Sequence, residues 1–133
     1  MKLIVFGATG DVGSRVVTEA CARGHDVTAA LRNDTAFDKL PKGVNLVVAD
    51  ATDPAALAAA MVGQDLAISA LRSPAGREGE IVGLTRTILE AASNADLRVI
   101  IVGGAARLRL PDGSPHTVLS DPDFQDRVRT AIW

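Results

Sequence analysis

Residues 4–14 read Ile4-Val5-Phe6-Gly7-Ala8-Thr9-Gly10-Asp11-Val12-Gly13-Ser14, and this stretch decides the fold. An apolar run ends in three glycines spaced three residues apart and passes directly into a helical pattern. Gly7 permits a tight turn after a strand, Gly10 lets a ligand approach the backbone, and Gly13 lets the helix lie close to the strand. The first N–H groups of such a helix have no intrahelical partners and favour an anion. The stretch therefore predicts a turn that binds a pyrophosphate.

The alternative is an ordinary glycine-rich turn with no ligand. The residues on either side of the glycines favour the pyrophosphate-binding turn. The preceding run 2–6 is typical of a strand buried on both faces. The apolar positions of the following helix are Val12, Val16, Val17, Ala20 and Cys21. Gly24 marks the end of this helix, and a second strand at 26–31 completes a βαβ unit of roughly thirty residues.

Apolar runs and helical patterns continue to alternate along the chain. Further strands are predicted at 44–49, 66–71 and 98–102, and helices at 36–40, 54–62, 80–94 and 120–132. This alternation predicts a single α/β domain over residues 1–133, a Rossmann-type doubly wound parallel sheet of strand order 3-2-1-4-5. Residues 105–133 read as an irregular loop, with a turn in 108–115, and a terminal helix. The last strand or strands and the substrate-binding region of a full fold of this type are missing from the pattern.

Composition excludes several classes of function. With 133 residues, a net charge of −2 and no basic stripe, the chain is not expected to bind nucleic acid. No apolar run approaches the ~18 residues that a membrane helix requires, so we expect a soluble protein. Cys21 is the only cysteine and falls on the apolar face of the first helix, which predicts a buried, unreactive thiol and a reducing, cytoplasmic location.

The residue after the second strand bears on the choice of nucleotide. Ligands of such folds bind beyond the carboxyl ends of the strands, and the second strand ends near the adenosine ribose. This chain has Arg32 there, followed by Asn33, where an acidic residue would favour NAD(H). A guanidinium binds a 2′-phosphate through paired charged hydrogen bonds, which predicts NADP(H) over NAD(H). An exposed arginine at a strand end is the alternative, and Asp34 nearby would weaken the preference.

The other strand ends add candidates on topology alone. Asp50 follows the third strand and is either an acceptor for the adenine amino group, with Ala51 giving a backbone contact, or a loop carboxylate. Ala70 and Leu71 are expected to end the fourth strand beside the ribose and pyrophosphate. Gly103 follows the fifth strand and would leave space near the nicotinamide.

Neither histidine has a strong claim to catalysis. His25 falls in the turn before the second strand, away from the predicted site, and is expected to be structural. His116 follows the fifth strand, where an imidazole could donate a proton to a substrate. The alternative, an exposed loop histidine, is favoured. No His, Cys or carboxylate pair has the spacing of a metal site, so no metal is predicted.

Several segments together resemble the atypical short-chain dehydrogenase/reductases, in particular the NAD(P)H-binding, NmrA-like branch that includes flavin reductases. They are Gly7–Gly13, Gly24–Val27, Arg32-Asn33, Val48–Asp53 and Val102–Ala105. The resemblance covers residues 1–106. It implies that Arg32 contacts the 2′-phosphate and Asp50 the adenine. It also implies that the pyrophosphate is held by Gly7, Thr9, Gly10, Val12 and Gly13. With Asp11 in the same turn, these residues and the strand-end candidates form the predicted coenzyme site.

One departure from the family affects its chemistry. Typical short-chain dehydrogenases use a Tyr-x-x-x-Lys pair, and this chain contains no tyrosine. The leading hypothesis is an oxidoreductase that passes hydride from NADPH to a small or flavin-like acceptor. The alternatives are a non-catalytic nucleotide-binding sensor or a shortened form with little activity. The fifth strand would leave an unpaired apolar edge. We therefore expect the protein to self-associate, either through this edge or through the long helix at 80–94.

Overall fold

The computed structural model describes residues 1–33, 40–73, 76–77, 79–104 and 109. The chain divides into two compact units, residues 1–102 and 103–133, and the helices and strands below belong to the first. The assignment of residues 1–133 to one domain stays a prediction. Three expected elements fall wholly or mostly outside the described residues: the helix at 36–40, the loop at 108–115 and the helix at 120–132.

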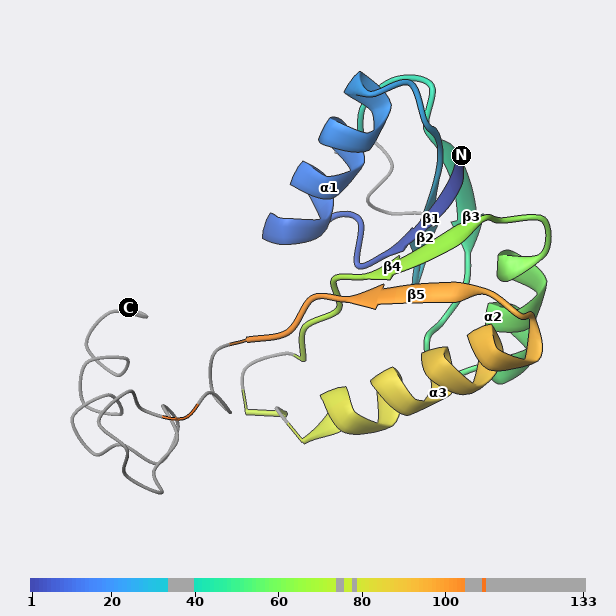
Figure 1. Ribbon diagram of the computed structural model, residues 1–133. Coiled ribbons are helices and arrows are strands. Elements are labelled where there is room, and N and C mark those ends of the chain that lie inside the picture. The colour runs from blue at the N-terminus through green and yellow to red at the C-terminus, as the bar shows by residue number, and fades with distance from the viewer. Residues whose placement is uncertain (34–39, 74–75, 78, 105–108, 110–133) are drawn as a thin grey trace, which may run out of the picture. The chain divides into compact units, whose positions relative to one another are not determined.

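The first unit is built on a parallel sheet of strand order β3-β2-β1-β4-β5 (Figure 1). Its strands are β1 (Lys2–Phe6), β2 (Asp26–Leu31), β3 (Asn45–Val48), β4 (Leu66–Ser69) and β5 (Arg98–Ile101). The helices are α1 (Asp11–Ala22), α2 (Pro54–Met61) and α3 (Glu80–Asn94). The predicted Rossmann-type α/β fold with strand order 3-2-1-4-5 is confirmed.

The predicted ends of three strands were too late. β3 spans Asn45–Val48, where 44–49 was expected. β4 ends at Ser69 and not at Leu71. The Ala70 N–H makes a last hydrogen bond to the Phe6 carbonyl of β1 (2.9 Å), and the chain leaves the sheet after it. Ala70 and Leu71 therefore begin a loop. β5 similarly ends at Ile101, one residue earlier than expected.

The register aligns the carboxyl ends of the inner strands at one edge of the sheet. Phe6 of β1 lies beside Ala30 of β2 and Ser69 of β4, and Leu31 lies beside Val48 of β3. The loops that follow these strands therefore leave the sheet side by side. This edge is where a fold of this type binds its ligand.

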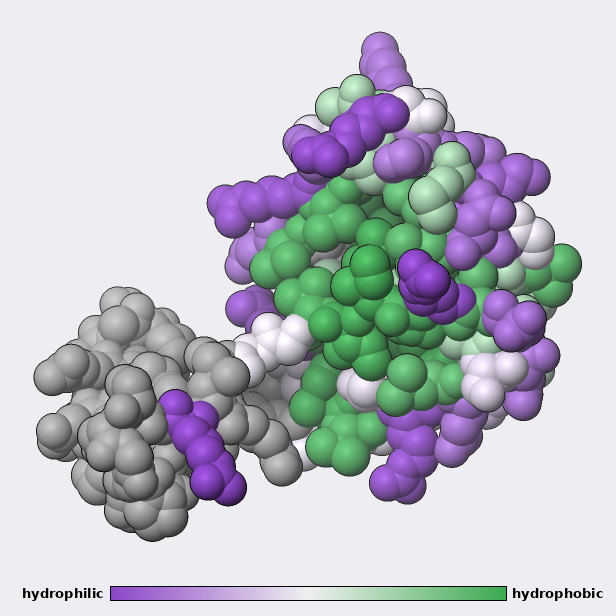
Figure 2. Space-filling view, viewed as in Figure 1, coloured by the Kyte–Doolittle hydropathy of each residue, from purple (hydrophilic) through white to green (hydrophobic). Residues whose placement is uncertain are grey.

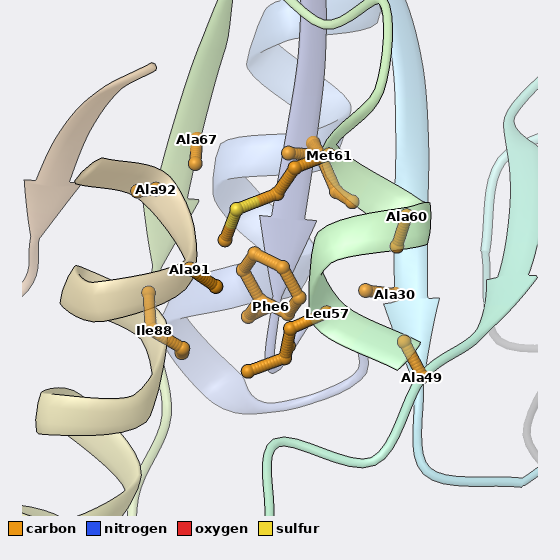
Figure 3. Close-up of a cluster of buried hydrophobic side chains, with 11 residues drawn as sticks. Phe6, Ala30, Ala49, Leu57, Ala60, Met61, Ala67, Ile88, Ala91 and Ala92 are labelled. Carbon is orange, nitrogen blue, oxygen red and sulfur yellow. The ribbon is translucent and has the colours of Figure 1, made fainter. Parts of the chain in front are cut away.

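Two apolar cores hold the helices on opposite faces of the sheet. On one face, Phe6 packs with Leu57 of α2 and Ile88 of α3 (Figure 3). On the other, Val5 packs with Val17 of α1 in a second cluster. Because successive residues of β1 enter opposite cores, the continuous apolar run of this strand is explained. Complete burial of a side chain such as Leu57 contributes about 1.5–3 kcal/mol.

The apolar stripe of α1 is narrower than predicted. Val17 and Ala20 are buried, but Val12 is 46% exposed. Cys21 is half-buried at the margin of the core and was expected to be fully buried. The buried positions of α1 are Gly13, Val17 and Ala20, so its buried stripe begins after Val12.

Candidate functional site

The glycine turn after β1 has the tight geometry that its sequence predicts. Gly7 has a φ of +75°, a conformation that side chains disfavour, and the Gly10 N–H donates to the Gly7 carbonyl (3.1 Å). A Cβ on Gly7 would lie 2.7 Å from the carbonyl oxygen of Ala70. The backbone of the loop after β4 therefore packs directly against this turn.

The other two glycines face different surroundings. A Cβ on Gly13 would lie 2.0 Å from the Gly7 carbonyl oxygen, so α1 packs against the turn as closely as backbone allows. A Cβ on Gly10 would meet only that same oxygen, at 3.4 Å. The protein itself therefore requires glycine at position 13, whereas position 10 has open space beside it.

The amino terminus of α1 is left without a side-chain cap. Its N-cap residue is Gly10, which has no side chain to accept from the first turn. In α2, by contrast, the Asp53 carboxylate accepts from the N–H groups of Ala55 (2.9 Å) and Ala56 (3.2 Å). The N–H groups of the first turn of α1 (Asp11, Val12 and Gly13) therefore remain suited to an anionic ligand.

A cleft of about 490 Å³ opens at the carboxyl edge of the sheet. Loops after β1, β2, β3 and β4 and the start of α3 line it. The predicted coenzyme residues in its wall are Gly7, Thr9, Gly10, Arg32, Asp50, Ala51, Ala70 and Leu71. The structure thus brings together candidates that were selected by the glycine motif, by Arg32 and by topology. Asp11, Val12 and Gly13 are not among the residues that line the cleft and form the first turn of α1 beside the glycine turn.

The last two candidates, Gly103 and His116, belong to the second unit, and His116 lies outside the described residues. The roles of both stay predictions.

Asp50 has a structural role in this wall. Its Oδ1 atom accepts from the backbone N–H (2.9 Å) and the hydroxyl (2.8 Å) of Thr52. These two bonds, with a smaller effect from the charge of Arg32, hold the pKa of Asp50 below its ordinary value. The carboxylate is therefore ionised at neutral pH and fixes the loop after β3. Its role toward adenine stays a prediction.

Two arginine–carboxylate pairs line or border the cleft, and the sequence did not indicate them. Arg77 binds Glu80 through two short contacts, Nε to Oε1 at 2.6 Å and Nη2 to Oε2 at 2.7 Å. Arg72 approaches Asp11 less closely, with 3.9 Å between Nη1 and Oδ2. Arg72 follows the predicted fourth strand, so the strand-end rule applied to charged residues would have found it. The Arg77–Glu80 pair depends on the path of the intervening turn.

Comparison with known proteins now decides the family. The model of a family described as NAD(P)H-binding matches residues 7–129. The chain belongs to the NAD(P)H-binding family. The resemblance to the atypical short-chain dehydrogenase/reductases is confirmed at this level, and a nicotinamide coenzyme fits the open glycine turn and the uncapped start of α1.

Three similar proteins illustrate the range of this NAD(P)H-binding family. The chain is 28% identical over 130 residues to YwnB of Bacillus subtilis, covering 93% of this chain and 57% of YwnB. It is 31% identical over 128 residues to a 3-diazoavenalumate denitrifying reductase of a Streptomyces species, covering 86% and 41%. The solved structure of SP1627 from Streptococcus pneumoniae, described as a candidate NADH-flavin reductase, has 27% identity and a TM-score of 0.69, covering 97% and 59%. The chain therefore spans about half the length of these relatives.

Two negative findings concern the described part of the chain. Within it, no helix is both long enough and apolar enough to cross a bilayer. The same residues contain no group of three His, Cys, Asp or Glu side chains placed to hold a metal ion.

Proposed function

We propose that the chain binds NADP(H) in preference to NAD(H) in the cleft and reduces a small or flavin-like acceptor. The observation that carries the coenzyme preference is the position of Arg32. It is exposed, follows β2 directly and lines the cleft, and the next residue is Asn33. A carboxylate at this position would accept from the ribose hydroxyls and repel a 2′-phosphate, whereas a guanidinium attracts the phosphate.

The glycine turn would hold the pyrophosphate of the coenzyme. The N–H groups at the start of α1 have no side-chain cap, and the helix dipole adds a partial positive charge at that end. The open space at Gly10 leaves room for phosphate oxygens close to the backbone. This arrangement supports the roles that the family resemblance implies for Gly7, Thr9 and Val12.

The reduction itself depends on positioning more than on a protein acid. A bound nicotinamide supplies the hydride, while the protein binds and orients the coenzyme. The chain contains no tyrosine, so tyrosine-based proton transfer does not apply. The reductase and candidate flavin reductase among the relatives support a reductive reaction and an acceptor of this class. They also support assignment to the NmrA-like branch.

A nucleotide-binding sensor is the second candidate, and the lack of tyrosine favours it. Calorimetric titration with NADPH and with NADH tests the coenzyme, and tighter binding of NADPH is expected. Incubation with NADPH and a panel of quinones, flavins and aldehydes then tests catalysis. Turnover above the uncatalysed rate supports the reductase, whereas saturable binding with no turnover supports the sensor.

We also propose that the protein self-associates. Apolar side chains gather over the face formed by β5 and α3 in the first unit (Figure 2). They include Val82 and Leu89 of α3 and Ile100 and Ile101 of β5, all exposed. Exposed apolar edge strands favour pairing with another chain. Light scattering at micromolar concentration tests this, because a strictly monomeric species would contradict it. Localisation in the cytoplasm stays a prediction.

A further inference from the structure

The Arg77–Glu80 pair joins the turn before α3 to the first residue of that helix. Its two contacts of 2.6 and 2.7 Å give the fork-to-fork geometry in which arginine binds a carboxylate or a phosphate. Both side chains line the cleft. The pair therefore places a guanidinium, already oriented for an oxyanion, in the wall of the proposed coenzyme site.

Arg32 lines the same cleft from a different element, and Glu80 is in range of its charge. Its charge acts on Glu80, in addition to the hydrogen bonds and the charge of Arg77, to lower the pKa of that carboxyl. Arg32 follows β2 and Arg77 precedes α3, and both line the cleft. Glu80 is thus paired with Arg77 and shares the cleft with Arg32, an arginine from a distant part of the chain.

The contacts of Glu80 are open to exchange with a ligand. The side chains of Arg77 and Glu80 are 61% and 45% exposed. Ion pairs this exposed are weak in water, so little is lost when they separate. A phosphate monoester carries a charge of about −1.5 to −2 and three acceptor oxygens, more than a carboxylate offers.

The second arginine–carboxylate pair joins the loop after β4 to the start of α1. Arg72 lies near Asp11, the first residue of α1, beside the glycine turn proposed for the pyrophosphate. Arg77 instead binds Glu80, a carboxylate in range of the charge of Arg32, which is the residue proposed for the 2′-phosphate.

We propose that Arg77 and Arg32 together bind the 2′-phosphate of the coenzyme, and that the Glu80 carboxylate takes its place while no nucleotide is bound. This inference rests on the proposed function and adds a specificity residue, Arg77, and a competing internal anion, Glu80. Glu80 lowers the affinity for NADP(H) and leaves that for NAD(H) nearly unchanged.

Two substitutions test the two roles. In Arg77→Gln, the affinity for NADPH should fall about tenfold, the usual effect of losing a charged hydrogen-bond partner, while the affinity for NADH stays within about twofold. In Glu80→Gln, the affinity for NADPH should rise by about threefold or more, since the amide no longer competes for Arg77. Titration calorimetry measures both coenzymes. The fragments adenosine 2′,5′-bisphosphate and adenosine 5′-monophosphate repeat the comparison without the nicotinamide.

Arg86→Gln is the matched control, because Arg86 is exposed on α3 and does not line the cleft. It should leave the ratio of the two affinities unchanged. Equal changes for both coenzymes in Arg77→Gln, or a lower NADPH affinity in Glu80→Gln, would overturn the inference and leave the proposed coenzyme site standing. If the unsubstituted protein takes up neither coenzyme, the proposed function fails as well.

Discussion

A Cβ atom on Gly13 would lie 2.0 Å from the carbonyl oxygen of Gly7. No side chain fits at that separation, and the neighbouring atoms are backbone that cannot rotate away. The first turn of α1 is therefore packed against the end of β1 by the lack of a side chain at one position. The uncapped N–H groups of that first turn are held beside the glycine turn for the same reason.

Gly13→Ala should destabilise the protein by about 1–3 kcal/mol or more, as in other overpacked sites, because α1 must move away from the turn. Urea unfolding measures the change. Gly83→Ala is the control, since a Cβ there meets nothing within 4 Å and the residue lies inside α3. Removing a helical glycine at this site should stabilise the fold by about 0.5–1 kcal/mol. Equal stability of the two variants would contradict the packing argument.

Gly10→Val should keep the fold and lose the ligand. Gly10 has an extended backbone (φ −79°, ψ 173°) that any residue adopts, and a Cβ there has only one neighbour, at 3.4 Å. The unfolding free energy should change by less than about 1 kcal/mol, typical of a substitution at an open site. Binding of NADPH and of NADH should each weaken at least tenfold, by about 1.4 kcal/mol, because the side chain occupies the pyrophosphate position. Undiminished binding in this variant would remove the glycine turn from the site.

Arg32→Gln should act on one coenzyme only. The amide retains hydrogen-bond donors but not the charge, so NADPH binding should weaken by roughly 10- to 100-fold while NADH binding stays within about twofold. Paired calorimetric titrations at constant ionic strength measure the two changes. Arg23→Gln is a suitable control, because Arg23 pairs with Glu19 on α1 outside the cleft. A loss of NADPH affinity in the control would point to net charge in place of a specific contact.

The carboxylate of Asp50 should contribute to stability only above acidic pH. Its pKa in the folded protein lies below the ordinary value of 3.8, chiefly because of the bonds from Thr52. A lowered folded pKa stabilises the fold above the unfolded pKa, and this contribution disappears as the pH falls through the folded value. Asp50→Asn should therefore be less stable than the parent protein at pH 7, and the difference should shrink as the pH falls below the ordinary value of 3.8. Urea unfolding over a pH series measures this difference in stability. A difference independent of pH would contradict this account.

Sequence reasoning succeeded where the determinants are local in the chain. The bounds of α3 and β2 follow from hydrophobic periodicity, and the structure reproduces both as predicted. Asp53 and Pro54 mark the start of α2 because a cap and its helix lie within one turn. The strand order follows from the alternation of strands and helices, since parallel strands need crossover connections. These features depend on residues that are close together in the chain and not on contacts between distant residues.

The tertiary structure decided what depends on residues far apart in sequence. Ala70 leaves the sheet after one bond to Phe6, and no periodicity shows where that occurs. Arg32 and Arg77 line one cleft only because β2 and β4, on either side of β1, end at the same edge of the sheet. The sequence alone determined the topology and the anion-binding turn, because short-range spacing encodes them. The charges that surround the cleft were decided by folding, because the path of each loop depends on packing against the others.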